Sequence, residues 1–244
     1  MLVRSNNTIL RELLELVSKK RNMLFSPINI NFFSNYNDEL WFTSSLSMLT
    51  GKRNSKNLKD IVGSSANAVI ALLFGLGHTT KEIQHKLNDI TFYQSLINTG
   101  SKNYKPLSIT VGAKPSTIKT TLRRKQFKLS ATDCFFKWVQ EQISNKLVNP
   151  MATFEDLNVQ GKKQACFKNI HLIGLNIETG KLEIFNCKNT PDMPLAIAVR
   201  ICMSCSTTFS IVKIIDSTTH TNKVYVDGGL VLQHIDLRKY KIAS

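Results

Sequence analysis

The sequence lacks the features that would mark a membrane-spanning or secreted protein. Its longest apolar run, residues 68–76, is far shorter than the roughly 20 residues that a transmembrane helix needs. The N-terminus carries no secretory hydrophobic segment, because Arg4, Asn6 and Asn7 lead directly into the charged, amphipathic stretch 9–20. We therefore expect a soluble, cytoplasmic protein with neither a signal peptide nor a transmembrane segment.

Cysteine is scarce and irregularly spaced. The five cysteines are an odd number, and Cys202 and Cys205 form a CxxC pair. A zinc site would need two further ligands, and the sequence offers no second CxxC and no HxxxH to supply them. A redox CxxC should open a helix after a strand. The simpler interpretation is two small, reduced residues packed where a strand passes into a loop, so these cysteines predict no metal site.

Acidic residues are absent from residues 90–132, in a chain whose formal net charge is +15. Three interpretations of this basic stretch stay open. It forms a solvated face, it is attracted to an anionic membrane at about 1 kcal/mol per nearby basic residue, or it binds nucleic acid through charge alone. Its aromatic residues show no stacking pattern, which argues against nucleic acid. The basic residues that we expect to face a membrane include Lys114, Lys119, Arg123, Arg124, Lys125 and Lys128.

The remaining pattern predicts one α/β domain over residues 1–244. A hydrophobic fraction of 42% is enough for a sizeable core. Residues 1–40 are expected to form a divergent N-terminal part, with a helix over 9–20 and an irregular segment over 22–37. Thr79 or Thr80 is expected to cap a helix. We predict further helices at 43–49, 68–76, 80–87, 133–146 and 194–203, and strands at 59–62, 169–176, 181–186, 210–215 and 223–226.

The segment DIVGSSANAVIALLFGLG has the form of a nucleophile elbow centred on Ser65. In such a strand–turn–helix unit a sharp turn holds the serine hydroxyl clear of the sheet, and the helix N-terminus behind it favours a developing oxyanion. Gly63 and Ala66 are small enough to let strand and helix pass closely. Asn67 stands where the motif usually has glycine, and asparagine tolerates a positive φ better than most residues. The pattern predicts a serine nucleophile.

The segment KVYVDGGL places Asp227 on a double-glycine turn at the end of a strand. DGG also marks hairpin turns, in which the aspartate is only a turn former, and this alternative stays open. A Ser–Asp–His arrangement needs a late histidine, and His234 follows Asp227 too closely to suit a base and its orienting partner. A carboxylate that acts directly as the base of the serine is the more economical scheme. The other histidines are expected at the surface or in loops: His78, His85, His171 and His220.

Several segments, in the right order, resemble patatin-like phospholipases over about residues 58–237. LKDIVGSSANAVIALLFGLGHTTKEI is similar to that family's elbow strand and following helices, and TFEDL, residues 153–157, to its middle region. FKNIHLIGLNIETGKLEIFN resembles its central hairpin, MPLAIAVRICMSCST resembles the helix before its ASMS segment, and VYVDGGL carries its DGG motif. The resemblance implies a three-layer α/β/α fold with a mainly parallel central sheet.

The resemblance also implies an activity, the cleavage of acyl esters of phospholipids or neutral lipids by a Ser–Asp dyad without a cofactor. By position, Ser65 is the nucleophile and Asp227 the base. The residues expected to support the turns or the oxyanion are Gly63, Ala66, Asn67 and Gly228.

Two departures from the family pattern bear on that activity. Asn67 replaces a glycine, and the glycine-rich oxyanion loop expected well before the serine is missing, because Gly51 is the only glycine that precedes Gly63. The span 42–49 occupies the place of that loop. Losing one oxyanion donor costs roughly 2.7–4 kcal/mol in the transition state. Two hypotheses therefore stay open: a weakened lipid acyl hydrolase, and a degenerate member of the fold that binds lipid or membrane without catalysis.

Overall fold

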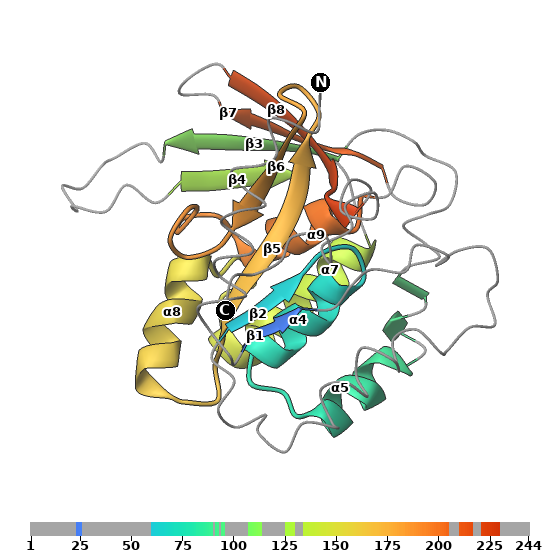
Figure 1. The fold of residues 1–244 in the computed structure, drawn as a ribbon, viewed down its shortest axis with the longest axis vertical. Coiled ribbons are helices and arrows are strands. Elements are labelled where there is room, and N and C mark those ends of the chain that lie inside the picture. Colours follow the sequence, from blue (N-terminus) through green and yellow to red (C-terminus); the bar gives the residue numbers. More distant parts are fainter. Residues whose placement is uncertain are drawn as a thin grey trace, which may run out of the picture.

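Eight strands form a mixed sheet in the computed structural model of this protein, and helices pack against it (Figure 1). The structure describes residues 23–25, 60–89, 91–92, 94–95, 107–113, 125–129, 134–204, 210–216 and 221–229. The strands, in chain order, are β1 (Met23–Phe25), β2 (Asp60–Gly63), β3 (Leu107–Ala113), β4 (Lys125–Leu129), β5 (Asn169–Asn176), β6 (Lys181–Phe185), β7 (Val212–Asp216) and β8 (Thr221–Asp227).

Most strands of the sheet run in one direction. Their order across the sheet is β1-β2-β5-β8-β7-β3-β4, and β6 pairs with β5 outside this path. β1, β2 and β5 are mutually parallel, and β3 is parallel to β7. β4, β6 and β8 are antiparallel to their neighbours. Five of the eight described strands therefore share one direction, and the predicted α/β class with a mainly parallel sheet is confirmed.

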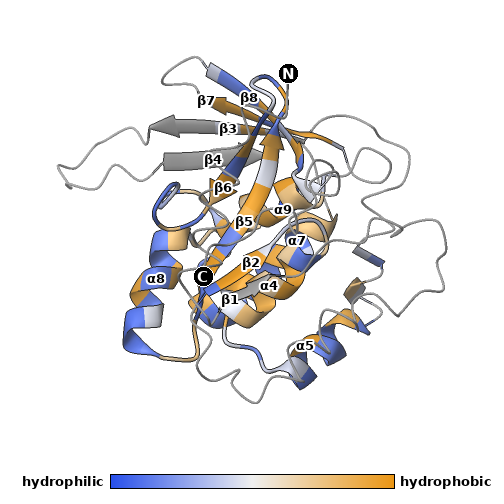
Figure 2. Cartoon of the chain, in the orientation of Figure 1, coloured by the Kyte–Doolittle hydropathy of each residue, from blue (hydrophilic) through white to orange (hydrophobic). Residues whose placement is uncertain are grey.

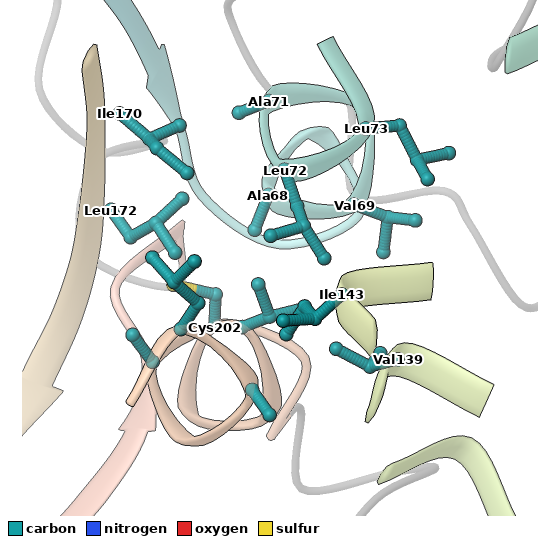
Figure 3. Close-up of a cluster of buried hydrophobic side chains, with 14 of the residues drawn as sticks. Ala68, Val69, Ala71, Leu72, Leu73, Val139, Ile143, Ile170, Leu172 and Cys202 are labelled. Carbon is teal, nitrogen blue, oxygen red and sulfur yellow. The ribbon is translucent and has the colours of Figure 1, made fainter. Parts of the chain in front are cut away.

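The described helices build the core together with the sheet. The helices, in chain order, are α4 (Asn67–Gly75), α5 (Thr80–Leu87), α7 (Cys134–Leu147), α8 (Phe154–Lys163) and α9 (Leu195–Cys202). α4 is buried along its whole length, as expected for a helix that is apolar on every side. It contacts β2, β5 and α9, and α7 packs on α9. Figure 3 shows the result, a single cluster to which Leu72, Ile143, Leu172 and Cys202 contribute from four different elements.

The two peripheral helices start with reciprocal caps. The N–H of Glu82 donates to Thr79 Oγ1 at 3.3 Å, and the Glu82 carboxylate accepts the N–H of Thr79 at 2.6 Å, which fixes the start of α5. Thr153 and Asp156 repeat this arrangement at the start of α8. Figure 2 shows both helices as largely hydrophilic, in contrast to α4, α9 and β5. Thr79 is thus confirmed as one of the two residues predicted to cap α5.

The sequence pattern placed most elements within two residues but missed four of them. β1 lies inside the segment 22–37, which was expected to be irregular, and over residues 23–25 this expectation is wrong. β3 and β4 form an antiparallel pair inside the acid-free stretch 90–132, for which no strand was predicted. α8 begins within the TFEDL segment, to which no secondary structure was assigned. The helices expected at 9–20 and 43–49 lie outside the described residues.

Candidate active site

A strained turn joins β2 to α4, and Ser65 is its central residue. β2 is buried at every position, and α4 begins two residues after Ser65. The φ angle of Ser65 is 54°, in the left-handed region that residues with a Cβ atom rarely adopt. Strain of this kind is typical of the serine in a nucleophile elbow, where it lifts the hydroxyl away from the sheet.

Gly63 allows β2 and α4 to approach each other closely. A Cβ atom on Gly63 would lie 2.6 Å from the carbonyl oxygen of Asn67 and 2.9 Å from Cα of Ala68. Both are backbone atoms in the first turn of α4, so no rotation of a side chain could relieve the overlap. Gly63, expected to support the turn, therefore stands where any larger residue would separate strand and helix.

Asn67 is accommodated differently from the expectation. It is the first residue of α4, and among the described non-glycine residues a positive φ occurs at Ser65 and Val148 only. The idea that asparagine fits through its tolerance of a positive φ is therefore wrong, because the left-handed position of the turn belongs to Ser65. The Asn67 side chain is buried, with 9% of its surface exposed, and imposes no backbone strain.

Asp227 is the last residue of β8 and is 1% exposed. Its own N–H donates to the carbonyl of Ser204 at 3.1 Å, and its Oδ1 accepts the N–H of Gly229 at 2.8 Å. The latter bond makes Asp227 a turn former, as the simpler interpretation of DGG holds. The turn also directs the carboxylate at the elbow, because Ser64 Oγ lies 3.0 Å from Oδ1. Gly228, which lies between Asp227 and Gly229 in the chain, passes close to the backbone of β5.

β5 brings the two turns together along one of its edges. Leu172 pairs with Gly63 of β2 and, on its other side, with Phe185 of β6. Gly174 likewise pairs with Asp227 of β8, opposite β6. β2 and β8 therefore occupy the same edge of β5 and approach each other end to end. The C-terminal ends of β2 and β8 therefore meet beside Ile173 of β5. This arrangement brings Ser64 into contact with Asp227, 163 positions away in sequence.

The burial of Asp227 changes its acid–base properties. Desolvation raises the pKa of the Asp227 carboxyl above its ordinary value. Hydrogen bonds to the ionised form oppose this rise, from the N–H of Gly229, from the hydroxyls of Ser65 and Ser64, and from the N–H of Ser65. A buried carboxylate with a raised pKa is a stronger base than an exposed one, and it sits against both serine hydroxyls. The predicted pair Ser65 and Asp227 is thus brought together.

Exposure distinguishes the two serines of the turn. Ser64 is 3% exposed, and its hydroxyl lies between Asp227 Oδ1 and the carbonyl oxygen of Ile173, the latter at 3.2 Å. Ser65 is partly exposed and carries the left-handed backbone. Ser65 is thus the more accessible of the two serines, so it remains the candidate nucleophile. The contact of Ser64 with the carboxylate was not predicted, and the doubled serine in GSSAN is the signal that could have suggested it.

The start of α4 offers one backbone donor to an oxyanion. The N–H of Asn67 donates to the carbonyl of Ser64 at 3.1 Å, and that of Ala68 to the carbonyl of Ser65 at 2.9 Å. The N–H of Ala66 has no hydrogen-bond acceptor in the part of the chain that the structure describes. β1 pairs with β2 up to Phe25, opposite Val62, so the described part of β1 ends beside this turn. The residues that follow Phe25, and the span 42–49, lie outside the described residues.

A buried arginine supports the turn of Asp227 through Ser204. Arg200 of α9 is fully buried, and its guanidinium donates to Ser204 Oγ at 2.8 Å and to the Ser210 carbonyl at 3.2 Å. Ser204 in turn supplies the carbonyl that accepts the N–H of Asp227. The guanidinium therefore ties the end of α9 to the chain entering β7, and through Ser204 it fixes the backbone of Asp227.

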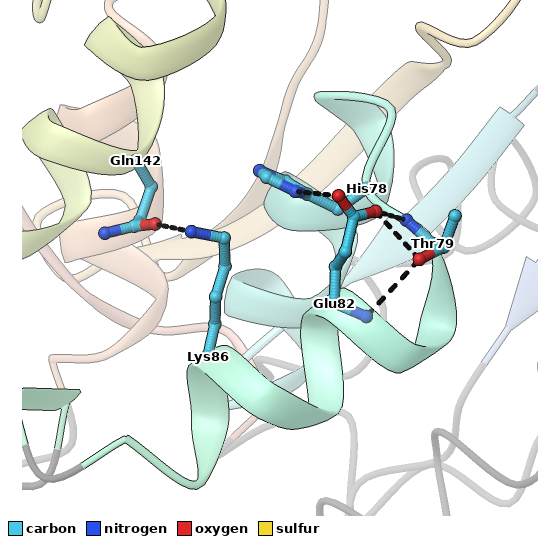
Figure 4. A network of polar contacts seen from close by, with 5 residues as sticks. All are labelled: His78, Thr79, Glu82, Lys86 and Gln142. Carbon is cyan, nitrogen blue, oxygen red and sulfur yellow. Dashed lines mark hydrogen bonds and ion pairs between the residues drawn. The ribbon is translucent and has the colours of Figure 1, made fainter.

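The described histidines take no part in the site. His171 was expected at the surface or in a loop, and this is wrong, because it lies in β5 and is 8% exposed. His78 lies in the loop between α4 and α5, as one form of the expectation had it, but it is only 6% exposed. His85 is exposed on α5, as expected. Neither His220 nor His234 belongs to the described residues. His78 lies beside Glu82 of α5, close to the pair formed by Lys86 and Gln142 (Figure 4).

A second polar cluster lies at the opposite end of β2. Asp60 Oδ1 and His171 Nε2 are 3.2 Å apart, and His171 Nδ1 is 3.1 Å from Asn186 Nδ2. These groups line a cavity of about 250 Å³ beside α8, which Cys187 also lines. Burial, together with the neighbouring Glu155, raises the pKa of the Cys187 thiol to about 11, so the thiol stays protonated. The cluster satisfies its own polar atoms and anchors β2 to β5.

Neither a metal site at the cysteines nor a membrane-spanning helix was expected from the sequence. Cys202 is a free, buried thiol whose Sγ lies 3.3 Å from the carbonyl oxygen of Ile173, and Cys205 is outside the described residues. Within the described ranges, no three His, Cys, Asp or Glu side chains gather in a way that could hold a metal ion. Over the same ranges, no helix combines the length and the apolar character needed to cross a membrane.

Comparison with known proteins identifies a family. The family model for patatin-like phospholipase matches residues 39–234. No curated protein matches the sequence. The crystal structure of VipD from Legionella pneumophila is similar at 14% identity and a TM-score of 0.44, covering 76% of this chain and 42% of that one. The crystal structure of the type III effector protein ExoU is similar at 20% identity and a TM-score of 0.39, covering 66% and 36%. This chain thus spans less than half the length of either protein.

Proposed function

This chain belongs to the patatin-like phospholipase family, and on that basis we propose that it is a lipid acyl hydrolase with a Ser65–Asp227 dyad. The substrate class is a carboxylic ester of a phospholipid or a neutral lipid. Ser65 is the nucleophile in this proposal, Asp227 is the general base, and no metal or cofactor takes part. The turn residues Gly63 and Gly228 hold the two groups in place.

The proposed reaction has two halves. Asp227 accepts the proton of Ser65 Oγ as this oxygen attacks the carbonyl carbon of the ester. The negative charge that develops on the carbonyl oxygen is stabilised by the N–H of Ala66 and by the N-terminal end of α4. The ester C–O bond then breaks, and Asp227 returns the proton to the leaving alcohol. In the second half Asp227 takes a proton from water, which attacks the carbonyl carbon of the acyl group on Ser65. The bond between this carbon and Ser65 Oγ then breaks, Asp227 returns the proton to Ser65 Oγ, and the fatty acid is released.

The observation that supports this proposal most strongly is the left-handed backbone of Ser65 between a buried strand and a buried helix. Holding a residue with a Cβ atom in this region costs about 1–2 kcal/mol. Such strain persists where the surrounding structure imposes it, and it is concentrated at functional sites. The raised pKa of Asp227, which lies within reach of the Ser65 hydroxyl, is the second support, because a general base needs this property.

We extend the proposal to a peripheral contact with anionic membranes. Lys125 and Lys128 belong to β4, the terminal strand of the sheet path. Four further basic residues lie in the connection between β3 and β4, outside the described residues: Lys114, Lys119, Arg123 and Arg124. Binding to vesicles with and without anionic lipid, at low and high salt, tests this contact. Replacement of all six residues by glutamine is expected to abolish the preference for anionic vesicles, and an unchanged preference would exclude the contact.

Labelling with a serine-reactive fluorophosphonate probe tests the dyad. We expect the wild-type protein to be labelled, and Ser65→Ala and Asp227→Asn to lose the label. Ser144→Ala is a matched control, because Ser144 is also partly exposed but lies on α7, where its hydroxyl donates to the carbonyl of Glu141. Release of fatty acid from phospholipid vesicles, measured by mass spectrometry on the same variants, connects labelling to turnover.

The outcomes separate hydrolysis from a non-catalytic role. Labelling that persists in Ser65→Ala would show that another residue is the nucleophile. A folded wild-type protein that is not labelled, yet binds vesicles, would identify a degenerate family member that acts as a lipid-binding module. That alternative draws its support from Asn67 and from the absence of glycine-rich sequence before Gly51.

A further inference from the structure

Ser64 precedes the candidate nucleophile and also contacts Asp227, but its side chain is more deeply buried. Its side chain is 3% exposed, so it has no access to a substrate. Its hydroxyl lies 3.0 Å from Asp227 Oδ1 and 3.2 Å from the carbonyl oxygen of Ile173. We propose that Ser64 is a positioning residue, which orients the Asp227 carboxylate so that Asp227 can serve Ser65. This role rests on the proposed function of the dyad.

The first step concerns the orientation of the carboxylate. Oδ1 of Asp227 accepts two hydrogen bonds, one from Ser64 Oγ at 3.0 Å and one from the N–H of Gly229 at 2.8 Å. These donors come from different segments, the elbow after β2 and the turn after β8. Two donors on one oxygen fix the rotation of the carboxylate about its Cβ–Cγ bond. The hydroxyl and the N–H of Ser65 are the other donors to this carboxylate.

The second step concerns the two acceptors that share the hydroxyl of Ser64. The hydroxyl has a single proton, and an ionised carboxylate is a stronger acceptor than a backbone carbonyl. While Asp227 is ionised, the proton of Ser64 therefore points to Oδ1. When Asp227 carries the proton taken from Ser65, its charge is gone and the carbonyl of Ile173 becomes a competitive acceptor. Ser64 thus keeps a buried hydrogen bond in both halves of the reaction, and neither state leaves its hydroxyl unsatisfied.

The third step concerns the ionisation of Asp227. Burial raises its pKa, and the hydroxyl of Ser64 is among the donors that lower it again. Removing this donor removes part of the stabilisation of the charged form, so the pKa of Asp227 must rise. The base is active when ionised, which means that the reaction rate increases with pH through this pKa. Loss of Ser64 therefore moves the acid limb of the pH profile of the reaction rate to higher pH. General loosening of the core would not have this effect, because water around the carboxylate favours its charged form.

The experiment compares Ser64→Ala, Ser64→Thr and Cys202→Ala with the wild-type protein. Cys202 is the matched control, because its thiol is buried and donates to the same Ile173 carbonyl at 3.3 Å but not to Asp227. The first readout is the pKa of Asp227 from carboxyl-¹³C NMR, assigned by its absence in Asp227→Asn. The second is the pH dependence of the fluorophosphonate labelling rate. Ser64→Thr keeps the hydroxyl and tests rescue.

We expect Ser64→Ala to raise the pKa of Asp227 and to lower the labelling rate at neutral pH about 10- to 100-fold, the range of a hydrogen bond to a charged group. Ser64→Thr should restore most of both, and Cys202→Ala should leave the pKa unchanged. An unshifted pKa in Ser64→Ala, or an equal shift in Cys202→Ala, would overturn the proposal.

The NMR titration needs no turnover, so it stays readable even if the wild-type protein is not labelled and the proposed function fails. A pKa shift without labelling in any variant would retain the Ser64–Asp227 coupling but remove its catalytic purpose, which also overturns the positioning role. Should Ser64→Ala not fold, Ser64→Cys provides the same comparison, because it keeps the size of the side chain and weakens the donor.

Discussion

Gly228 lies so close to Ile173 that a Cβ atom on it would stand 2.7 Å from the Ile173 carbonyl oxygen. The same carbonyl oxygen is 3.2 Å from Ser64 Oγ and 3.3 Å from Cys202 Sγ. The elbow, the turn after β8 and helix α9 therefore all converge on one backbone group of β5. The carbonyl group of Ile173 therefore sets the distance between Ser65 and Asp227, which neither turn sets alone.

Gly228→Ala should disturb both stability and chemistry. The new Cβ atom meets a backbone oxygen, so the turn or β5 must shift, and overpacking of this kind costs about 1–3 kcal/mol of unfolding free energy. The shift also moves Asp227 away from Ser65. The rate of fluorophosphonate labelling should therefore fall by more than the loss of unfolding free energy alone explains. Denaturant unfolding and labelling rates measure the two effects.

Gly161→Ala is the matched control for that substitution. Gly161 lies in α8, and a Cβ atom there would have its nearest neighbours at 3.9 Å, which is ordinary contact. Alanine is favoured over glycine in a helix by up to about 1 kcal/mol, so this variant should be as stable as the wild type or slightly more so. Equal stability of the two alanine variants would contradict the close approach at Gly228.

Replacing Ser65 by glycine should relieve the strain of the elbow. The φ of 54° disfavours any residue with a Cβ atom, whereas glycine adopts it without penalty. We expect Ser65→Gly to unfold at higher denaturant concentration than Ser65→Ala, by about 1 kcal/mol in free energy. Both variants should be unlabelled by the fluorophosphonate. If Ser65→Ala proved the more stable of the two, the turn would not hold a left-handed residue at this position.

Asp227→Asn should stabilise the protein while it abolishes activity. The folded-state pKa of Asp227 lies above the ordinary value of 3.8, so ionisation is more costly in the folded state than in the unfolded one. The contribution of Asp227 to stability is fully present below pH 3.8 and is lost as pH rises through the folded pKa. Asparagine never ionises and keeps an acceptor oxygen for the N–H of Gly229.

The measurement for that prediction is unfolding free energy against pH for both proteins. The difference in favour of Asp227→Asn should grow from pH 4 to neutral pH. A wild-type protein that is the more stable of the two at neutral pH would show that its hydrogen bonds outweigh the burial of the charge.

The sequence revealed the parts of the site that have a local pattern. An apolar strand, small turn residues and an apolar helix mark the elbow at Ser65, and DGG marks the turn at Asp227. The contact between them depends on the register of β2 and β8 along β5, which no local pattern encodes. β1 was missed for a similar reason, since three residues in an Asn-rich segment become a strand only through pairing with β2. His171 is buried because Asp60, far away in sequence, supplies its partner.

His78 lies in an unusual environment at the junction of α4, α5 and α7. It is 6% exposed, and neither ring nitrogen has a hydrogen-bond partner among the described residues. Its Nδ1 is 3.9 Å from Glu82 Oε1, the nearest group that could compensate a positive charge (Figure 4). Burial, followed by the charges of Lys146 and Lys86, lowers the pKa of His78 to about 4, and Glu82 opposes the shift.

This environment should make stability depend on His78 in mild acid. The folded pKa of about 4 lies below the ordinary value of 6.5, so the stability that neutral His78 confers is fully present above pH 6.5. It is lost as pH falls from 6.5 towards 4, where only the unfolded chain binds the proton, and the loss is on the order of 2 kcal/mol. His78→Leu should flatten this part of the pH profile, since leucine has a similar size and no hydrogen bond of the ring is lost.

His85→Leu, on the exposed side of α5, should leave the pH profile of stability as in the wild type. Unfolding free energies between pH 4 and pH 7 measure the effect, and an unchanged acid slope in His78→Leu would mean that other groups cause it.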